Sequence, residues 1–240
     1  MLFTRLLQSA SAAARLPGLC AVCRGWGSQR VCGDCVQRFA FRVPRCRRCA
    51  LQVPAGAQVC GACLTDPPPY ARTLAAVDYD YPWDGLITHF KFHDALDLAP
   101  ALAERMLAAR GDAQTPALLV PIPLSDARLR ERGYNQAWEL TKRLGAALHC
   151  PVDATLLLRV KDTPHQLAFP PDQRAGNVRA AFAIEPKRRA ELQGRCVTLV
   201  DDVMTSGATV AEATRTLLQT GASEVDVWVI ARTPRHEAQP

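Results

Sequence analysis

The chain has 240 residues and a mass of 26.2 kDa, enough for one large domain or for a core domain with a small module. Hydrophobic residues make up 48% and charged residues 22%, proportions typical of globular proteins that exclude a mainly disordered chain. No run of about 18 apolar residues occurs, so we expect no membrane span. The apolar stretch at residues 6–16 is interrupted by Gln8 and two serines, and we interpret it as a short amphipathic helix rather than a signal peptide.

The formal net charge of +6 is unevenly distributed along the chain. Residues 1–63 contain nine arginines, no lysine and one acidic residue, Asp34, which gives this segment a charge of +8. The remainder of the chain is close to neutral. A basic segment on a near-neutral body suggests an anionic partner, unless the arginines offset negative charge nearby.

Eight of the ten cysteines form four CxxC pairs inside this basic segment, with loops of 8, 10 and 10 residues between consecutive pairs. The pairs are Cys20/Cys23, Cys32/Cys35, Cys46/Cys49 and Cys60/Cys63. Because each pair places two thiolates on one turn, the four pairs predict two tetrahedral Zn²⁺ sites with bonds of about 2.3 Å. Neighbouring pairs or crossed pairs could share a metal, and the spacing leaves both arrangements open.

Two other interpretations of the cysteines are a disulfide scaffold and redox CxxC motifs. Since no export signal is evident, we expect a cytoplasmic chain whose thiols stay reduced, and four copies in one short segment favour metal. Two four-thiolate zinc sites would carry a charge of about −4 together and would offset part of the arginine excess. We expect Cys196, which opens an apolar run, to be a buried core thiol.

The remaining elements alternate between strands and helices. A zinc-binding module of the knuckle or ribbon type is predicted at residues 1–64, a Pro-rich linker at 65–72 and a second domain at 73–235. Apolar patterning predicts strands at 74–79, 117–121, 180–184, 195–200 and 224–230, and helices at 84–93, 98–110, 134–149 and 207–219. Gly221 is the expected C′ residue of the last helix. This alternation indicates an α/β domain with a mainly parallel sheet.

A ribose-phosphate site is predicted where the strand at 195–200 ends. Asp201 and Asp202 follow the strand directly, and a hydroxyl-rich loop with Gly207 then leads into a helix. Ligands of open parallel sheets bind at the carboxyl ends of strands, and N–H groups at a helix start favour an anion. The carboxylates would repel a phosphate, but they suit the diol of a sugar and could help to hold Mg²⁺ through water. The alternatives are a capped helix start and a two-acid metal site.

This segment resembles the 5-phosphoribosyl 1-pyrophosphate (PRPP) motif of type I phosphoribosyltransferases. The resemblance implies that Asp201 and Asp202 hold the ribose hydroxyls and that Thr205, Ser206, Gly207, Ala208 and Thr209 cradle the 5′-phosphate. It also implies a flavodoxin-like parallel sheet with a flexible hood, and Mg²⁺ bound together with PRPP.

A more specific resemblance covers residues 20–231. A Val-Pro-Ile-Pro-Leu turn occupies residues 120–124, and an Arg-Gly-Tyr-Asn-Gln block occupies 132–136. Farther on stand Asp162-Thr163-Pro164, Gln166, Arg174, Asn177-Val178 and Ala181-Phe182. With four CxxC pairs in front, the chain resembles the ComF (competence protein F, or GntX-like) family. It departs from the family pattern at Ser125, where many relatives carry His, and at Phe169, where Leu is usual.

The turn after the Val120 strand would meet the phosphate loop at one sheet edge if the strands are parallel. Candidates for the pyrophosphate side are Pro123, Leu124, Arg128 and Arg132, and the two arginines offer fork-shaped donors. Lys161 and Arg174 are the candidates from the loop at 159–178, which could close over the site as the hood. Lys91, between two phenylalanines, suits a surface position as well as a ligand-binding one.

Two classes of function follow. The first is an enzyme that transfers the 5-phosphoribosyl group of PRPP to an acceptor, although no general base stands out and the catalytic residues are unknown. The second is a non-catalytic adapter that senses PRPP or holds single-stranded DNA through its basic zinc module. The ComF resemblance implies a role in DNA uptake during natural transformation, with a competence-associated DNA helicase as a partner.

Overall fold

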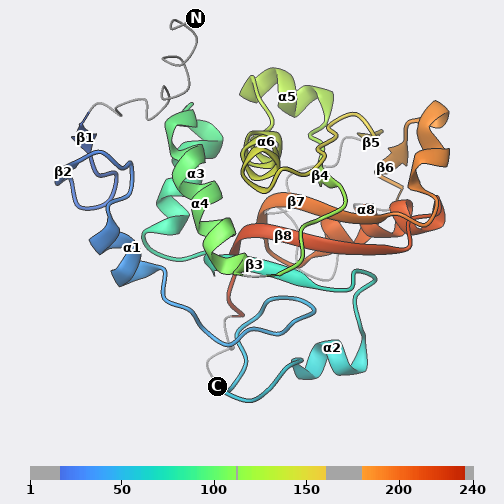
Figure 1. The fold of residues 1–240 in the computed structure, drawn as a ribbon, viewed down its shortest axis with the longest axis horizontal. Helices are drawn as coiled ribbons and strands as arrows, with labels where there is room; N and C mark the ends of the chain where they lie inside the picture. The colour runs from blue at the N-terminus through green and yellow to red at the C-terminus, as the bar shows by residue number, and fades with distance from the viewer. Residues whose placement is uncertain (1–16, 112, 161–179, 236–240) are drawn as a thin grey trace, which may run out of the picture.

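The computed structural model describes residues 17–111, 113–160 and 180–235 (Figure 1). The amphipathic helix predicted at 6–16 and the hood candidates Lys161 and Arg174 lie outside the described residues. The strands are β1 (Gly18–Leu19), β2 (Trp26–Gly27), β3 (Thr73–Asp78), β4 (Leu119–Pro121), β5 (Leu157–Arg159), β6 (Phe182–Ile184), β7 (Cys196–Met204) and β8 (Glu224–Arg232). The helices are α1 (Gly33–Phe39), α2 (Gly61–Thr65), α3 (Trp83–Phe92), α4 (Ala99–Arg110), α5 (Asp126–Arg132), α6 (Gln136–Leu148) and α8 (Ala208–Gln219), with 3₁₀ turns η1 (Leu96–Leu98) and η3 (Pro186–Leu192).

The central sheet has the strand order β3-β8-β7-β4, and its neighbouring strands are parallel. This arrangement confirms the predicted α/β class with a parallel sheet. Strands β5 and β6 form a separate antiparallel pair at one side of the sheet (Figure 1). In the described part of the chain, no helix combines the length and the apolar character needed to cross a bilayer.

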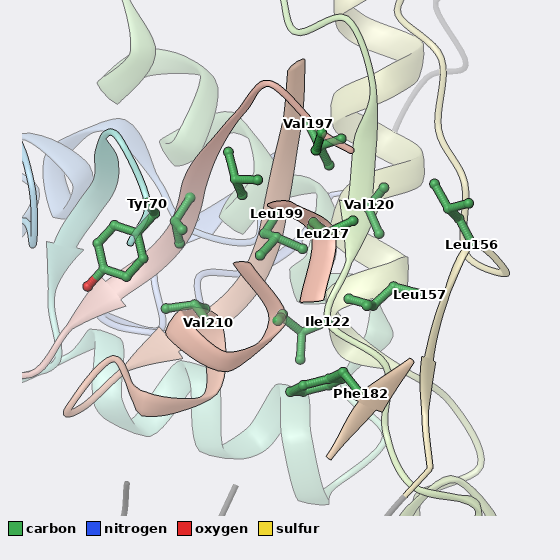
Figure 2. Close-up of a cluster of buried hydrophobic side chains, with 14 of the residues drawn as sticks. Tyr70, Val120, Ile122, Leu156, Leu157, Phe182, Val197, Leu199, Val210 and Leu217 are labelled. Atoms are coloured by element: carbon green, nitrogen blue, oxygen red, sulfur yellow. The ribbon is translucent and has the colours of Figure 1, made fainter. Parts of the chain in front are cut away.

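Both faces of the sheet are covered, which explains why its inner strands are continuous apolar runs. Along β8, Val227 and Val229 face the cluster that includes α8, whereas Trp228 and Ile230 face the cluster that includes α3, α4 and α6. Figure 2 shows the first of these clusters, which extends from Tyr70 to Phe182 of β6. Burying apolar side chains on both faces removes the sheet from water and so stabilises it.

Strand β7 extends farther than the sequence predicts. It continues to Met204, whereas its partner β4 ends at Pro121, opposite Val200. Only β8 accompanies the last residues of β7, where Asp201 pairs with Val229 and Met204 with Arg232. One edge of β7 is therefore left open beside the two aspartates.

The predicted helix at 134–149 begins later, at Gln136, and a further helix that was not predicted, α5, precedes it. The side chain of Asn135 accepts hydrogen bonds from the N–H groups of Ala137 and Trp138 and so caps α6. Ser125 caps α5 in the same way, and Gly133 ends that helix in the left-handed conformation. The Arg-Gly-Tyr-Asn-Gln block is thus a junction between two helices.

The N-terminal segment passes along one side and the underside of the sheet (Figure 1). The indole of Trp83 donates to the carbonyl of Phe39 at 2.7 Å, and the guanidinium of Arg45 lies 2.7 Å from the carboxylate of Asp78. Tyr70, inside the predicted linker, is buried in the same cluster as Leu199. The division at residues 64 and 72 stays a prediction.

The structure confirms the prediction for Gly221 and contradicts the one for Cys196. Gly221 follows the C-cap residue of α8 with φ of 118°, as its predicted C′ role requires. The expectation for Cys196 was wrong: the residue is exposed at the start of β7, where the apolar part of the strand has not yet begun.

Candidate functional site

The eight paired cysteines form two tetrads, joined as consecutive pairs. Cys20, Cys23, Cys32 and Cys35 make the first tetrad, and Cys46, Cys49, Cys60 and Cys63 make the second. In each tetrad all sulfur atoms lie within 4.8 Å of one another. The crossed arrangement that the spacing left open is therefore excluded.

Both tetrads have the same local construction. The first CxxC pair sits on a tight turn that ends in a residue with positive φ, Arg24 in one tetrad and Ala50 in the other. The second pair starts a short helix, because Cys32 is the N-cap of α1 and Cys60 is the N-cap of α2. This repeat explains how each short segment can present four sulfur atoms to one point.

The sulfur separations fit a tetrahedral metal. Pairs of sulfurs lie 3.9 Å apart for Cys20 and Cys35, 3.7 Å for Cys23 and Cys32, and 3.6 Å for Cys49 and Cys60. A tetrahedron with metal–sulfur bonds of about 2.3 Å has edges of about 3.8 Å. A disulfide bond would need about 2.05 Å, so the tetrads are suited to Zn²⁺ and not to disulfides.

Main-chain donors favour the thiolate form of one cysteine in each tetrad. Burial acts to raise the pKa of Cys20, but the N–H groups around it, including that of Cys32, outweigh burial and lower the pKa to about 6. The same balance lowers the pKa of Cys46 to about 7, with the N–H of Cys60 3.3 Å from its sulfur. Thiolates are the form of cysteine that binds zinc.

A cavity of about 240 Å³ opens beside the free edge of β7. The two aspartates of the strand line it, and Thr205 and Thr209 line it from the loop and the start of α8. The other side is formed by Leu124, Arg128 and Arg132 from the turn after β4 and from α5. The structure thus brings residues from three separate predicted motifs around one space.

Gly207 fixes the path of the loop between β7 and α8. It is the N-cap of α8 with φ of 82°, a conformation that suits glycine. A Cβ atom at this position would lie 3.0 Å from the hydroxyl of Tyr70. The first N–H groups of α8 have no acceptor within the helix, so this helix start is suited to an anion.

The two aspartates have different surroundings. Asp202 is 3% exposed, and its Oδ1 lies 2.9 Å from the ammonium of Lys91, whereas its buried Oδ2 has no hydrogen-bond partner in the structure. Asp201 is half-buried, and burial together with the neighbouring Asp202 carboxylate raises its pKa to about 7. Such carboxylate oxygens suit sugar hydroxyls or a hard cation such as Mg²⁺.

Four basic side chains also line the cavity. Arg128 and Arg132 lie four residues apart on α5 and so share a face, and Lys91 and Arg159 complete the set. The guanidinium of Arg132 also stacks on the ring of Phe92, 4.8 Å from its centroid. Four cations around two carboxylates favour a ligand with more than one negative charge.

Some predicted residues do not line this cavity. Pro123, Ser206, Gly207 and Ala208 are absent from its described lining; the hydroxyl of Ser206 accepts instead from the N–H of Ala208 at 3.3 Å. Ser125 is 4% exposed and caps α5. The pyrophosphate, phosphate and hood assignments stay predictions.

Arg159 and Tyr79 line the cavity although the sequence did not predict them, and Lys91 lines it although the sequence left its role open. Tyr79 directly follows β3, so the rule that ligands bind where parallel strands end could have found it. Lys91 lies one turn after the buried Ile87 on α3, which places it beside the buried face of the helix. Arg159 ends β5, a strand that the sequence pattern did not predict.

A larger cavity, about 380 Å³, lies at the opposite edge of the sheet, where β3, β7 and β8 begin. Three of its charged residues pair with each other, since Arg72 lies 3.6 Å from Glu224 and 3.8 Å from Asp226. The smaller cavity is the better candidate because strand ends, a helix start and basic side chains converge there.

No family model matches the chain. The chain is 35% identical over 230 residues to DNA utilization protein YhgH of Salmonella typhimurium, covering 91% of this chain and 98% of the relative. It is 32% identical over 222 residues to Competence protein F of Haemophilus influenzae, covering 89% and 96%.

Among solved structures, a purine phosphoribosyltransferase from Pyrococcus horikoshii aligns with 57% of this chain and 82% of its own, at 19% identity and a TM-score of 0.30. The two curated relatives, the DNA utilization protein and Competence protein F, are matched over almost their whole length. The chain belongs to the ComF (competence protein F, or GntX-like) family.

Proposed function

We propose that the chain binds PRPP, or another phosphorylated ribose, with Mg²⁺ in the cavity beside β7. From PRPP it transfers the 5-phosphoribosyl group to an acceptor, and it takes part in DNA uptake. The observation that carries this proposal is the convergence of Asp201, Asp202, Thr205 and Thr209 with Arg128 and Arg132 around one cavity. The names of the two relatives, a DNA utilization protein and a competence protein, support the biological role.

Each part of the ligand has suitable chemistry in the cavity. The carboxylates of Asp201 and Asp202 would accept hydrogen bonds from the ribose diol, and the loop from Thr205 to Thr209 would donate to the 5′-phosphate. Arg128 and Arg132 would lie on the pyrophosphate side, where two adjacent guanidinium groups suit a polyanion. The orphaned Oδ2 of Asp202 is a site at which a hydroxyl or a cation-bound water could donate.

In the transfer step, the bond from C1 to the pyrophosphate oxygen breaks and pyrophosphate leaves with the electron pair. Arg128, Arg132 and Lys91 stabilise the charge that develops on the departing oxygens. An acceptor then donates an electron pair to C1 and loses a proton. Bound Mg²⁺ supplies further charge stabilisation when it accompanies PRPP.

Calorimetry with PRPP and Mg²⁺ tests the binding proposal. The double variant Asp201→Asn/Asp202→Asn should weaken PRPP binding by about tenfold or more, because charge-assisted hydrogen bonds to the diol are lost. Asp226→Asn, in the opposite cavity, is the matched control and should bind as the unchanged chain does. Equal affinities of the double variant and the unchanged chain would refute the assignment, and pyrophosphate release with added bases would separate turnover from binding alone.

A second function, a single-stranded-DNA adapter, is favoured by the surface around the first tetrad. Trp26 is 78% exposed and Phe41 67%, and Arg38 lies over the ring of Phe39 at 5.3 Å. Exposed aromatic rings among arginines suit stacked bases and a phosphate backbone. In this role the chain would act in the cytoplasm, beside a competence-associated helicase.

Fluorescence anisotropy with a labelled oligothymidine tests the adapter role. The affinity should fall steeply between about 50 and 200 mM salt, because bound counterions are released when arginines neutralise phosphates. Trp26→Ala should lower the affinity by about tenfold, whereas Leu64→Ala, which removes an exposed aliphatic side chain of α2, should not. An affinity that does not change with salt would exclude this function.

A further inference from the structure

The guanidinium of Arg232 connects the second cysteine tetrad to the loop that follows β7. Its Nε donates to the carbonyl of Cys49 at 2.8 Å, and its terminal nitrogen donates to the carbonyl of Met204 at 2.9 Å and to that of Thr205. Cys49 is a ligand candidate of the second tetrad, whereas Met204 ends β7 and Thr205 begins the loop proposed to hold the 5′-phosphate. One side chain therefore bridges two sites that lie far apart in the sequence.

The bridge is buried and carries a charge. Arg232 is 6% exposed, and it donates hydrogen bonds to the main-chain carbonyls of Cys49, Met204, Thr205 and Thr233. A guanidinium removed from water is costly unless negative charge lies nearby. Four thiolates around one Zn²⁺ carry a charge of −2, so the second tetrad is a suitable source of that charge.

Hydrophobic packing also connects the turn of the second tetrad with the loop that follows β7. Ala50, the residue after Cys49, is fully buried in the cluster that contains Tyr70 and Met204. The hydroxyl of Tyr70 lies under Gly207, close enough that a Cβ atom there would approach it to 3.0 Å. The turn of the second tetrad and the phosphate loop thus share a packed core as well as a hydrogen-bond bridge.

The first tetrad has no such connection in the described structure. Its residues Cys20 and Cys35 pack in the cluster on the other face of the sheet, with Trp83 and Phe90 of α3. The loop from Met204 to Gly207 is not part of that cluster. The two tetrads are alike in sequence and local construction, but the first packs against α3 whereas the second contacts the loop that follows β7.

We propose that Arg232 is a positioning residue that holds the phosphate loop in its binding conformation, and that it does so only when the second tetrad holds its metal. Anion binding at the loop then depends on the metal content of the second tetrad and not on that of the first. This inference rests on the proposed function, because the loop is taken to hold the 5′-phosphate.

The experiment compares Cys60→Ser in the second tetrad with Cys23→Ser in the first, alongside Arg232→Lys and Arg232→Met. Zinc content is measured for each variant, hydrogen–deuterium exchange is followed for residues 203–211, and calorimetry measures affinity for ribose 5-phosphate. Cys60→Ser and both Arg232 variants should speed exchange in the loop and weaken ribose 5-phosphate binding by about tenfold, the size expected for losing charge-assisted hydrogen bonds. Cys23→Ser should lose metal yet leave both readouts within about twofold.

Arg232→Lys keeps the positive charge but loses the planar set of guanidinium donors. An effect of this variant on the loop therefore reports the lost hydrogen bonds and not a general loss of folding. The double variant Cys60→Ser/Arg232→Lys should be no worse than either single variant, because both act through one bridge. Equal effects of Cys23→Ser and Cys60→Ser, or additive effects in the double variant, would overturn the inference. If the unchanged chain does not bind ribose 5-phosphate, the proposed function fails, and exchange in the loop still decides whether Arg232 couples it to the tetrad.

Discussion

The ammonium of Lys91 lies 2.9 Å from the carboxylate of Asp202, and this contact joins α3 to the end of β7. The Asp202 side chain is 5% exposed and the Lys91 side chain 18%, so water screens the pair only weakly. The pair lies on the wall of the candidate cavity and therefore connects the stability of the fold with the electrostatics of the site.

Replacing Lys91 by Gln should lower the free energy of unfolding by about 3 kcal/mol, because it leaves a buried carboxylate without its cation. Lys142→Gln is the matched control, since Lys142 pairs with Glu139 at 2.7 Å on the exposed side of α6; its loss should cost less than about 1 kcal/mol. Urea denaturation at neutral pH measures both values. Adding Asp202→Asn to Lys91→Gln should recover part of the loss, and equal costs for the two lysine variants would contradict the prediction.

Gly207→Ala should reduce the free energy of ribose 5-phosphate binding by more than it reduces the free energy of unfolding. The change forces a side chain into a backbone with φ of 82° and toward the hydroxyl of Tyr70, so the loop must shift. Gly133→Ala is the control, because Gly133 has a similar φ of 77° and open space around it. Calorimetry and thermal melting measure the two effects.

If steric contact with Tyr70 contributes, Tyr70→Phe should partly restore binding to Gly207→Ala, because it removes the oxygen that the new Cβ approaches. An unaltered affinity in Gly207→Ala would show that the loop does not need this backbone conformation.

The cysteine tetrads lead to a prediction about metal content. The purified chain should hold two zinc ions, one for each tetrad. Cys23→Ser and Cys60→Ser should each lose about one zinc, because three thiolates bind the metal more weakly than four. Cys150→Ser is the control, since Cys150 belongs to neither tetrad. Elemental analysis after gel filtration gives the stoichiometry, and a loss of metal from the Cys150 variant would contradict the assignment of the zinc ligands to the two tetrads.

The ion pair between Asp153 and Arg188 predicts how stability depends on pH. Burial acts to raise the pKa of Asp153, but hydrogen bonds from Arg188 and Thr155 outweigh it and hold the pKa below its usual value. The folded state thus favours the charged carboxylate, so its contribution is present above the unfolded-state pKa of about 3.9. That contribution is lost as the pH falls through the lower folded-state pKa.

Asp153→Asn should therefore be less stable than the unchanged chain at pH 7, and the difference should shrink as the pH falls below about 4. The melting temperatures of Asp153→Asn and of the unsubstituted protein are compared at each pH. Acid also releases zinc, but it does so from both proteins, so this effect largely cancels when one melting temperature is subtracted from the other. A difference that stays constant down to acid pH would rule out an ionised Asp153 as its source.

The sequence predicted most of the central fold because the apolar runs of the inner strands are long and uninterrupted. Strands β3, β7 and β8 fall where the runs around Val77, Leu199 and Val227 predict them. Helix α5 was missed because its residues Asp126–Arg132 are mostly charged and none of them is buried. Its boundaries depend on Ser125 and Gly133, whose capping roles apolar periodicity does not reveal.

The residues of the candidate site that belong to one sequence motif could be predicted, whereas those that come from separate helices and strands could not. Asp201 and Asp202 could be found from a strand followed by a hydroxyl-rich helix start, whereas Lys91 comes from α3 and Arg159 from β5. Their approach to the aspartates depends on β4 ending opposite Val200 while β7 continues. Strand length relative to a partner is a tertiary property, and periodicity within one segment does not contain it.

Two glycines inside helices should respond in opposite ways to alanine, although helix propensity alone favours the change by about 1 kcal/mol at both. A Cβ atom on Gly145 of α6 would overlap Cγ1 of Val152 and lie 3.2 Å from the carbonyl of Cys150. Gly145→Ala should therefore cost about 1–3 kcal/mol, because a packed core tolerates added atoms poorly. Gly85→Ala in α3 meets nothing within 4 Å and should raise stability by up to about 1 kcal/mol. Urea denaturation of both variants measures the sign, and a stabilised Gly145→Ala would mean that α6 does not pack on the segment at 150–152 as described.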